Sequence, residues 1–202
     1  LHCHSHYSFL RAVPSPEELV TAAAEQKMPA VALTDTNGLY AAVPFYLAAR
    51  EAGVKPIIGT VLDIEWRDKS ETQNTKLETR DKEETGASPL LLLAANREGY
   101  SNLCRLVTER QLNDRPVDLE TLNAHRAGLI ALYAPGGANA GAALRLRSLR
   151  PCSGQAGQAC CAPTSSECVA RLKEIFGDAL YLEVQHFSAG DGRALAGTQG
   201  RA

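Results

Sequence analysis

The sequence lacks the features that mark membrane, secreted and strongly nucleic-acid-binding proteins. It has no apolar run of about 18 residues and no charged, apolar and small-residue leader, so it predicts neither a membrane span nor a secretory signal. Its 21 Lys and Arg residues nearly balance its 23 Asp and Glu residues, which leaves a net charge of -2. A phosphate-binding face normally carries a basic excess, so this balance argues against a strong grip on nucleic acid by this chain alone. We expect a cytoplasmic protein without a membrane partner.

Paired zinc-binding knuckles are also missing. Four of the six cysteines fall late in the chain: Cys152, Cys160, Cys161 and Cys168. They do not form two CxxC motifs, so we do not expect a zinc site there. Cys3 and Cys104 occur in strand and helix patterns, where buried free thiols are ordinary.

The 202 residues, 45% of them hydrophobic, are enough for one domain with one core. No internal repeat is evident at the periods typical of solenoids. We expect the domain to span residues 1–186 and residues 187–202 to form a flexible tail. The first residue is Leu and already belongs to a strand-like stretch, so we expect a piece of a longer protein.

Apolar strand patterns alternate with capped helix patterns along the chain. Strands are predicted at 1–9, 30–33, 54–66, 90–95, 128–134 and 179–185. Helices are predicted at 16–27, 39–52, 97–110, 119–126 and 168–178. Ser15 with Glu18 forms a capping box, and Asn96 and Asp118 are N-cap residues. Strands separated by helices predict an α/β protein with a parallel sheet or barrel.

Two internal segments break this regularity. Residues 67–88 are almost wholly polar and predict an exposed loop or a hairpin extension. Residues 135–167 have little apolar periodicity and are expected to be an irregular insertion. A frame error or a degraded gene is one hypothesis for this insertion and for the tail.

Three of the five histidines fall within the first nine residues, "LHCHSHYSF". In an extended strand, His2, His4 and His6 would share one face, where neutral imidazoles could hold a divalent ion. A solvated terminal flap or an artificial terminal extension would explain the same cluster.

Further polar residues follow the predicted strands. Asp35 ends the second strand, Asp63 and Glu65 lie far along the third, and His186 follows the sixth. Histidines and carboxylates on one rim suit a metal-dependent phosphoesterase, in which ions convert water to hydroxide and screen phosphate oxygens. Asp35 could instead cap the next helix, and His186 could be a hydrogen-bonding rim residue.

Several blocks together resemble the PHP (polymerase and histidinol phosphatase) domain that begins bacterial DNA polymerase III alpha subunits and related error-prone polymerases. The blocks are "LHCHSHYSFL", "MPAVALTDTNGLYAAVPFYLAAREAGVKPIIG", "LLLLAANREGYSNLCRLV", "GLIALYA" and "RLKEIFGDALYLEVQ". The resemblance implies a distorted (βα)7 TIM-like barrel, here expected to be incomplete at its C-terminus.

Intact members of this family bind three divalent ions, usually zinc or manganese, and hydrolyse phosphoesters. His2 and His4 match the family's HxH motif, and Asp35 matches the Asp of its TDH motif. The departures are Thr36 for the histidine of that motif, Val61 for a glutamate and Pro89 for a histidine. The final Asp-x-His motif would be expected beyond residue 202 and is absent from this sequence. We expect at most a partial zinc or manganese site made by His2, His4 and Asp35.

The weaker candidate ligands are His6, Glu65 and His186, with Asp63 as a further stand-in. We assign no catalytic and no cofactor-binding residue. The first hypothesis is a scaffold domain of a replicative or error-prone polymerase, with the polymerase core, DNA and other replisome subunits as partners. The polymerase site itself would lie outside this chain.

Two enzyme hypotheses stay open. One is a metal-dependent phosphoesterase or 3'-5' exonuclease with residual activity, based on the HxH motif and Asp35. The other is a relative of histidinol phosphatase, which is weaker because "NREGYSNLCRLV" resembles the polymerase branch.

Overall fold

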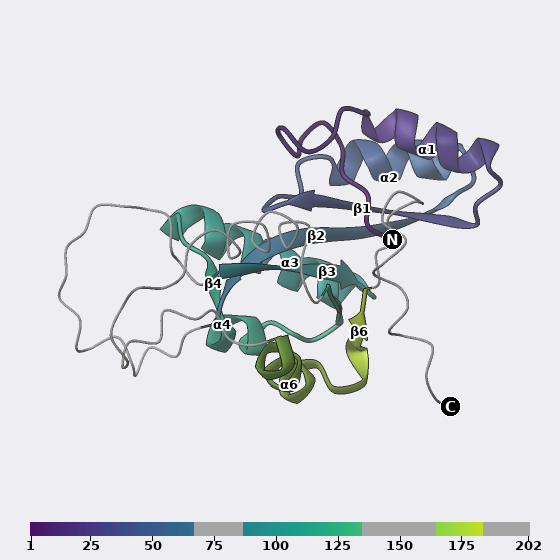
Figure 1. Ribbon diagram of the computed structural model, residues 1–202. Coiled ribbons are helices and arrows are strands. Elements are labelled where there is room, and N and C mark those ends of the chain that lie inside the picture. Colours follow the sequence, from purple (N-terminus) through teal and green to yellow (C-terminus); the bar gives the residue numbers. More distant parts are fainter. Residues whose placement is uncertain (67–86, 135–164, 184–202) are drawn as a thin grey trace, which may run out of the picture.

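The computed structural model describes residues 1–66, 87–134 and 165–183, and these form a mixed α/β structure around one sheet (Figure 1). The strands are β1 (Ala30–Thr36), β2 (Lys55–Glu65), β3 (Ala87–Ala94), β4 (Val117–Asp118), β5 (Leu129–Tyr133) and β6 (Leu180–Leu182). The helices are α1 (Pro16–Glu25), α2 (Ala42–Glu51), α3 (Arg97–Asn113), α4 (Leu119–Ala124), α6 (Ser165–Phe176) and the short 3-10 helix η2 (Gly177–Ala179). The strand order is β1-β2-β3-β5-β6, and β4 pairs with β2. No helix in the described ranges has the length and apolarity needed to cross a membrane.

Three predicted helix starts, those of α1, α3 and α4, are confirmed because their caps are encoded locally. The other two are displaced: α2 begins at Ala42 instead of 39, and α6 begins at Ser165 instead of 168, inside the predicted irregular insertion 135–167. The Ser15 side chain accepts from the Glu18 backbone, and the Glu18 side chain accepts from the Ser15 backbone, at 3.1 and 2.8 Å. Asn96 Oδ1 accepts from the Gly99 backbone at the start of α3. Asp118 accepts from Thr121 N at 2.7 Å in the same way for α4. Each bond satisfies a backbone donor that the first helical turn leaves unpaired.

The predicted strand at 1–9 is wrong. Residues 1–5 have no regular secondary structure, and turns and bends follow at residues 6–11. The chain still lies against β1, because Thr34 N donates to the Cys3 carbonyl at 2.8 Å and Cys3 N donates to Thr34 Oγ1 at 3.1 Å. The strand β3 begins at Ala87, so residues 87 and 88 belong to a strand and not to the predicted polar loop 67–88. The other residues of that predicted loop, 67–86, lie outside the described ranges.

The expectation of a parallel sheet is also wrong for two of its strand pairs. Strands β1/β2, β2/β4 and β5/β6 are parallel, whereas β2/β3 and β3/β5 are antiparallel. A parallel pair needs a crossover that returns the chain, usually a single helix. No helix was predicted between β2 and β3, and two helices, α3 and α4, separate β3 from β5. The short strand β4 lies between these two helices, so β3 and β5 are not joined by a single crossover helix.

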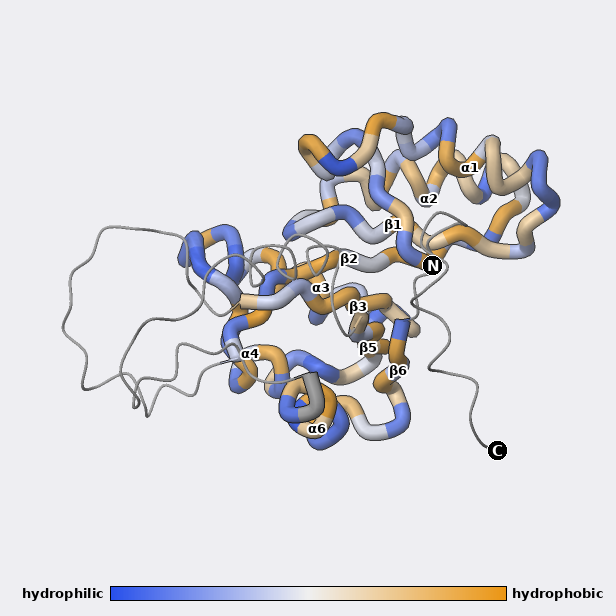
Figure 2. Tube along the Cα trace, viewed as in Figure 1, coloured by the Kyte–Doolittle hydropathy of each residue, from blue (hydrophilic) through white to orange (hydrophobic). Residues whose placement is uncertain are grey.

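Side-chain alternation gives the sheet two different faces. On one face, Leu62 and Ile64 of β2 pack in the cluster that contains residues of α3, α4 and α6. On the same face, Leu33 of β1 packs with Val20 of α1 and Phe45 of α2 in a second cluster. The opposite face carries a third cluster from strands alone: Ala32, Val61, Leu91 and Leu93. Figure 2 shows the hydrophobic stretches along β2 and β3 that supply these clusters.

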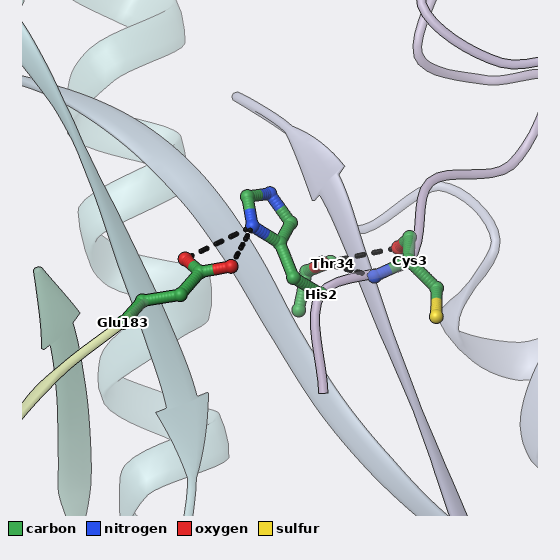
Figure 3. A network of polar contacts seen from close by, with 4 residues as sticks. All are labelled: His2, Cys3, Thr34 and Glu183. Atoms are coloured by element: carbon green, nitrogen blue, oxygen red, sulfur yellow. Dashed lines mark hydrogen bonds and ion pairs between the residues drawn. The ribbon is translucent and has the colours of Figure 1, made fainter. Parts of the chain in front are cut away.

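The N-terminal segment bridges the two ends of the strand order. Its Cys3 is hydrogen-bonded to β1, as described above, and its His2 contacts Glu183 directly after β6 (Figure 3). Glu183 is held in turn by its backbone N–H, which donates to the Tyr133 carbonyl of β5 at 2.9 Å. The sheet is therefore curled enough for residues 2–3 to reach from one edge to the other.

Candidate metal centre

His2 and His4 lie together beside the C-terminal half of β1. Their ring centroids are 5.0 Å apart, and the ring planes are inclined by 65°. Both side chains are partly buried. The sequence prediction that these two imidazoles share a site is consistent with this geometry, although the segment carrying them is not a strand.

His2 is oriented by Glu183, a residue that the sequence analysis did not single out. His2 Nδ1 lies 2.9 and 3.1 Å from the two carboxylate oxygens of Glu183 (Figure 3). A carboxylate only accepts hydrogen bonds, so Nδ1 carries the proton and Nε2 is the remaining ring nitrogen. Metal-binding histidines commonly have such a carboxylate behind them. The partners are 181 residues apart in sequence. The only local signal for Glu183 is that it is a charged residue within the predicted strand 179–185.

His4 is held in the neutral form that binds metals. Burial is the largest cause that lowers the pKa of the His4 imidazole, and the nearby His2 lowers it further. Asp35 opposes this shift, but the net direction of the pKa is downward. His4 Nδ1 also contacts Ser8 Oγ at 3.2 Å. Neutral imidazole is the ligand form, so His4 is electrostatically suited to a cation.

Asp35 has a different environment, in which its carboxylate holds the N-terminal loop. The residue is only 2% exposed. Its Oδ1 accepts from Ser5 N and from Ser8 Oγ, and its Oδ2 accepts from Ser5 Oγ, each at 2.7 Å. Ser8 Oγ in turn accepts from Thr36 N at 3.0 Å. These bonds join residues 5–8 to the end of β1.

The pleat of β1 points Asp35 away from Thr36, a position that departs from the family pattern. Successive strand residues point to opposite faces, so Asp35 shares the face of Leu33, which packs under α1 and α2. Thr36 shares the opposite face with its register partner Val61. The metal-ligand role of Asp35 stays a prediction, and its hydrogen bonds favour a role as an anchor.

The three departures from the family pattern gather on that opposite face. Thr36 and Val61 are register partners in β1 and β2. Pro89 of β3 is the register partner of Asp63, which lies two residues beyond Val61 and therefore on the same face. Thr36 Oγ1 is buried without a hydrogen-bond partner within the described structure. Thr36 and Pro89 thus occupy positions where the family pattern has histidines, and Val61 occupies a position where it has a glutamate.

The proposed stand-in ligands are engaged elsewhere or lie at a distance. Asn37 Nδ2 donates to Asp63 Oδ2 at 2.7 Å, and Asp63 N donates to Asn37 Oδ1 at 3.2 Å. Glu65 follows Val61 by four residues, which is about 13 Å along a strand. The exposed His6 ring stacks on Tyr7 with a centroid distance of 4.5 Å. His186 lies outside the described residues.

A three-ion cage does not fit the side chains present. Within residues 1–66, 87–134 and 165–183, no group of three His, Cys, Asp or Glu side chains is placed to hold a metal ion. His2 and His4 provide two nitrogen donors, and the register partners Thr36 and Val61 provide neither an imidazole nor a carboxylate. Charged ions brought together without bridging carboxylates repel one another, so two imidazoles support one cation at most. We derive no hydrolytic step from this arrangement.

Comparison with known proteins gives a family match over nearly the whole chain. The model of the family described as "PHP domain" matches residues 1–187. A DNA polymerase III subunit alpha from Chlamydia trachomatis is 38% identical over 138 residues, which cover 66% of this chain and 11% of that protein. An error-prone DNA polymerase from Anaeromyxobacter sp. is 36% identical over 165 residues, which cover 73% of this chain and 13% of that protein.

The chain therefore matches only about a tenth of the length of these relatives. Among solved structures, an amidohydrolase from Chromobacterium violaceum aligns with a TM-score of 0.41 and 15% identity, covering 66% of each chain. Such a low TM-score carries no conclusion about fold or activity.

Proposed function

Because the chain belongs to the PHP domain family, we propose that it is the N-terminal PHP domain of a bacterial DNA polymerase of the polymerase III alpha or error-prone type. The chain is homologous to polymerases of both types, and the homologous part of each is a small share of a much longer protein. The acidic residues that would add nucleotides would lie in the remainder of the parent protein.

Within that parent the domain acts mainly as a scaffold with a degraded metal site. One observation carries this proposal: the register partners Thr36 and Val61 occupy the positions where the family pattern has a histidine and a glutamate, and their side chains cannot complete a metal cage. The Asp35 carboxylate is instead occupied by Ser5 and Ser8. The packing of strands and helices is retained while ligands are lost, as expected for a domain that is kept for its shape.

The proposed architecture is the distorted (βα)7 barrel of this family, incomplete at its C-terminus. The contact of His2 with Glu183 supports it, because this contact joins the segment beside β1 to the residue after β6. The partners of the domain are the polymerase core of the parent chain, DNA bound by that parent, and other replisome subunits. The cytoplasm is the compartment that this role requires.

A second function is favoured by a specific observation. His2, backed by Glu183, and neutral His4 form a two-imidazole corner that suits one zinc or manganese ion. A single ion there would polarise a phosphate oxygen or a water molecule. The domain would then be a phosphoesterase or 3'-5' exonuclease with residual activity.

Metal analysis of the purified chain tests these two functions. We expect fewer than one zinc or manganese ion per chain after dialysis against each metal, because the described residues offer only two imidazoles in one place. We also expect no hydrolysis of nitrophenyl phosphate or of single-stranded DNA above a no-protein control. Metal content is measured by mass spectrometry, and affinity by isothermal titration calorimetry.

The double variant His2→Ala with His4→Ala identifies the site responsible for any binding. His125→Ala is the matched control, because His125 lies at the C-cap of α4, outside the candidate centre. Binding of two or more ions, with hydrolysis lost in the double variant and kept in the control, would refute the scaffold proposal. Binding of one ion, with weak hydrolysis that is lost in the double variant and kept in the control, would establish the phosphoesterase or exonuclease with residual activity.

A further inference from the structure

An exposed apolar surface lies next to the candidate centre and is not part of the buried core. It consists of Phe9, Leu10 and Val13 in the loop before α1, and of Tyr40, Val43 and Leu47 at α2. Their exposed fractions range from 59% for Leu47 to 91% for Leu10. We name these six residues the apolar rim surface. Clustered exposed apolar side chains of this size mark interaction sites more often than isolated ones do.

The two parts of the surface are joined. The Tyr7 ring, 46% exposed, lies 6.5 Å from the Tyr40 ring with the planes inclined by 25°. Val43 and Leu47 are four residues apart on α2 and therefore lie on one face of the helix, and Tyr40 lies in the turn two residues before the helix begins. Figure 1 shows the loop beside the N-terminal end of α2, and Figure 2 shows hydrophobic residues in both.

The loop is anchored at its base and presents its apolar tip outward. Ser5 and Ser8 are bonded to buried Asp35, and His6 N donates to the Pro14 carbonyl at 2.9 Å. At the tip, Leu10 has φ of 60°, the left-handed region that a leucine rarely adopts. Residues kept in such a conformation cluster at binding sites, because the surrounding structure must hold them there.

The charge of this surface favours a protein partner over nucleic acid. Between His6 and Pro14 the only charged side chain is Arg11. On α2 the charged residues are Arg50 and Glu51, and the Arg50 guanidinium lies over the Tyr46 ring at 5.8 Å. Binding to a nucleic-acid backbone needs several cations, whereas an apolar protein face needs few charges.

We infer that the apolar rim surface packs against an apolar face of the polymerase part of the same parent chain. This inference rests on the proposed function. The homologous polymerases devote only 11 to 13% of their length to the matched region, so most of their chain is available to cover an exposed apolar face. Contacts between domains of one chain resemble transient protein–protein interfaces and combine apolar with polar side chains.

Hydroxyl-radical footprinting of the complete parent protein and of the 202-residue chain tests the inference. Phe9 and Tyr40 should be modified at least about 10-fold more slowly in the parent, because an interface core excludes water. Leu112 on α3, 78% exposed, serves as the reference and should keep its rate. In the parent, Leu10→Asp combined with Val43→Asp should restore modification of Phe9 and Tyr40, whereas Leu112→Asp should not.

Each alternative result overturns the inference in a recognisable way. Equal modification rates in the parent and in the short chain mean that the surface stays open, while the polymerase assignment stands. Protection of the short chain alone at high concentration, with a dimer seen by light scattering, assigns the surface to a second copy. Protection that appears only with single-stranded DNA assigns it to nucleic acid. A parent gene without a polymerase region refutes the proposed function and removes the occupant as well.

Discussion

Replacing Asp35 with alanine is expected to lower the free energy of unfolding by about 3–5 kcal/mol. The buried carboxylate accepts three hydrogen bonds at 2.7 Å from Ser5 and Ser8, and alanine leaves those donors without a partner. Bonds to a charged group and unsatisfied buried donors are both costly, so the effect should exceed that of an ordinary polar substitution. Urea denaturation followed by circular dichroism measures the loss.

Asp35→Asn is the matched variant for this prediction. The amide keeps an acceptor oxygen for two of the bonds, and its NH2 group can donate to the Ser5 hydroxyl, so the expected loss is about 1–2 kcal/mol. A loss below about 1 kcal/mol for Asp35→Ala would contradict the anchoring role. An effect of Asp35→Ala that disappears when chelator is added would show that Asp35 acts through a bound metal.

Features encoded by neighbouring residues could be predicted from the sequence. Ser15, Asn96 and Asp118 cap the helices that they were expected to cap, because a cap depends on a side chain and a backbone group three residues away. The apolar run at 30–33 likewise falls within β1, and the runs at 90–95 and 128–134 match β3 and β5 except for one residue at the end of the first run and one at each end of the second.

Features decided by distant pairing could not be predicted in the same way. The antiparallel direction of β3 depends on its partners β2 and β5, and no local pattern specifies those partners. The alternating histidines suggested one strand face, yet a turn after His4 directs His6 toward Tyr7. The contact of His2 with Glu183 spans 181 residues, so only the folded chain reveals it.

The candidate site shows how one motif can contain two roles. Asp35 and Thr36 are adjacent in sequence and belong to the same family motif, but the pleat sends them to opposite faces of the sheet. The motif alone therefore suggested Asp35 as a ligand. Its hydrogen bonds to the loop give the carboxylate a structural role that does not depend on a metal ligand at position 36.

Gly99→Ala is expected to cost about 3–5 kcal/mol of stability or to prevent folding. A Cβ at this position would lie 1.9 Å from the Gly128 carbonyl oxygen and 2.6 Å from its carbon. Both are backbone atoms, so no side-chain rotation relieves the clash, and the start of α3 must separate from the chain entering β5. Thermal and urea denaturation measure the loss, and failure to recover folded protein counts as the same result.

Gly53→Ala is the control that separates this clash from the general effect of replacing a glycine. Gly53 has φ of +71° but nothing within 4 Å of an added Cβ, so only backbone strain of about 1 kcal/mol is expected. The Gly99 contact also matters for the candidate centre, because β5 carries the Tyr133 carbonyl that holds Glu183 beside His2. A displaced β5 should therefore alter the histidine ring signals of His2 in NMR spectra, whereas Gly53→Ala should leave them in place. Equal stability of the two variants would show that α3 and β5 are not in the close contact described.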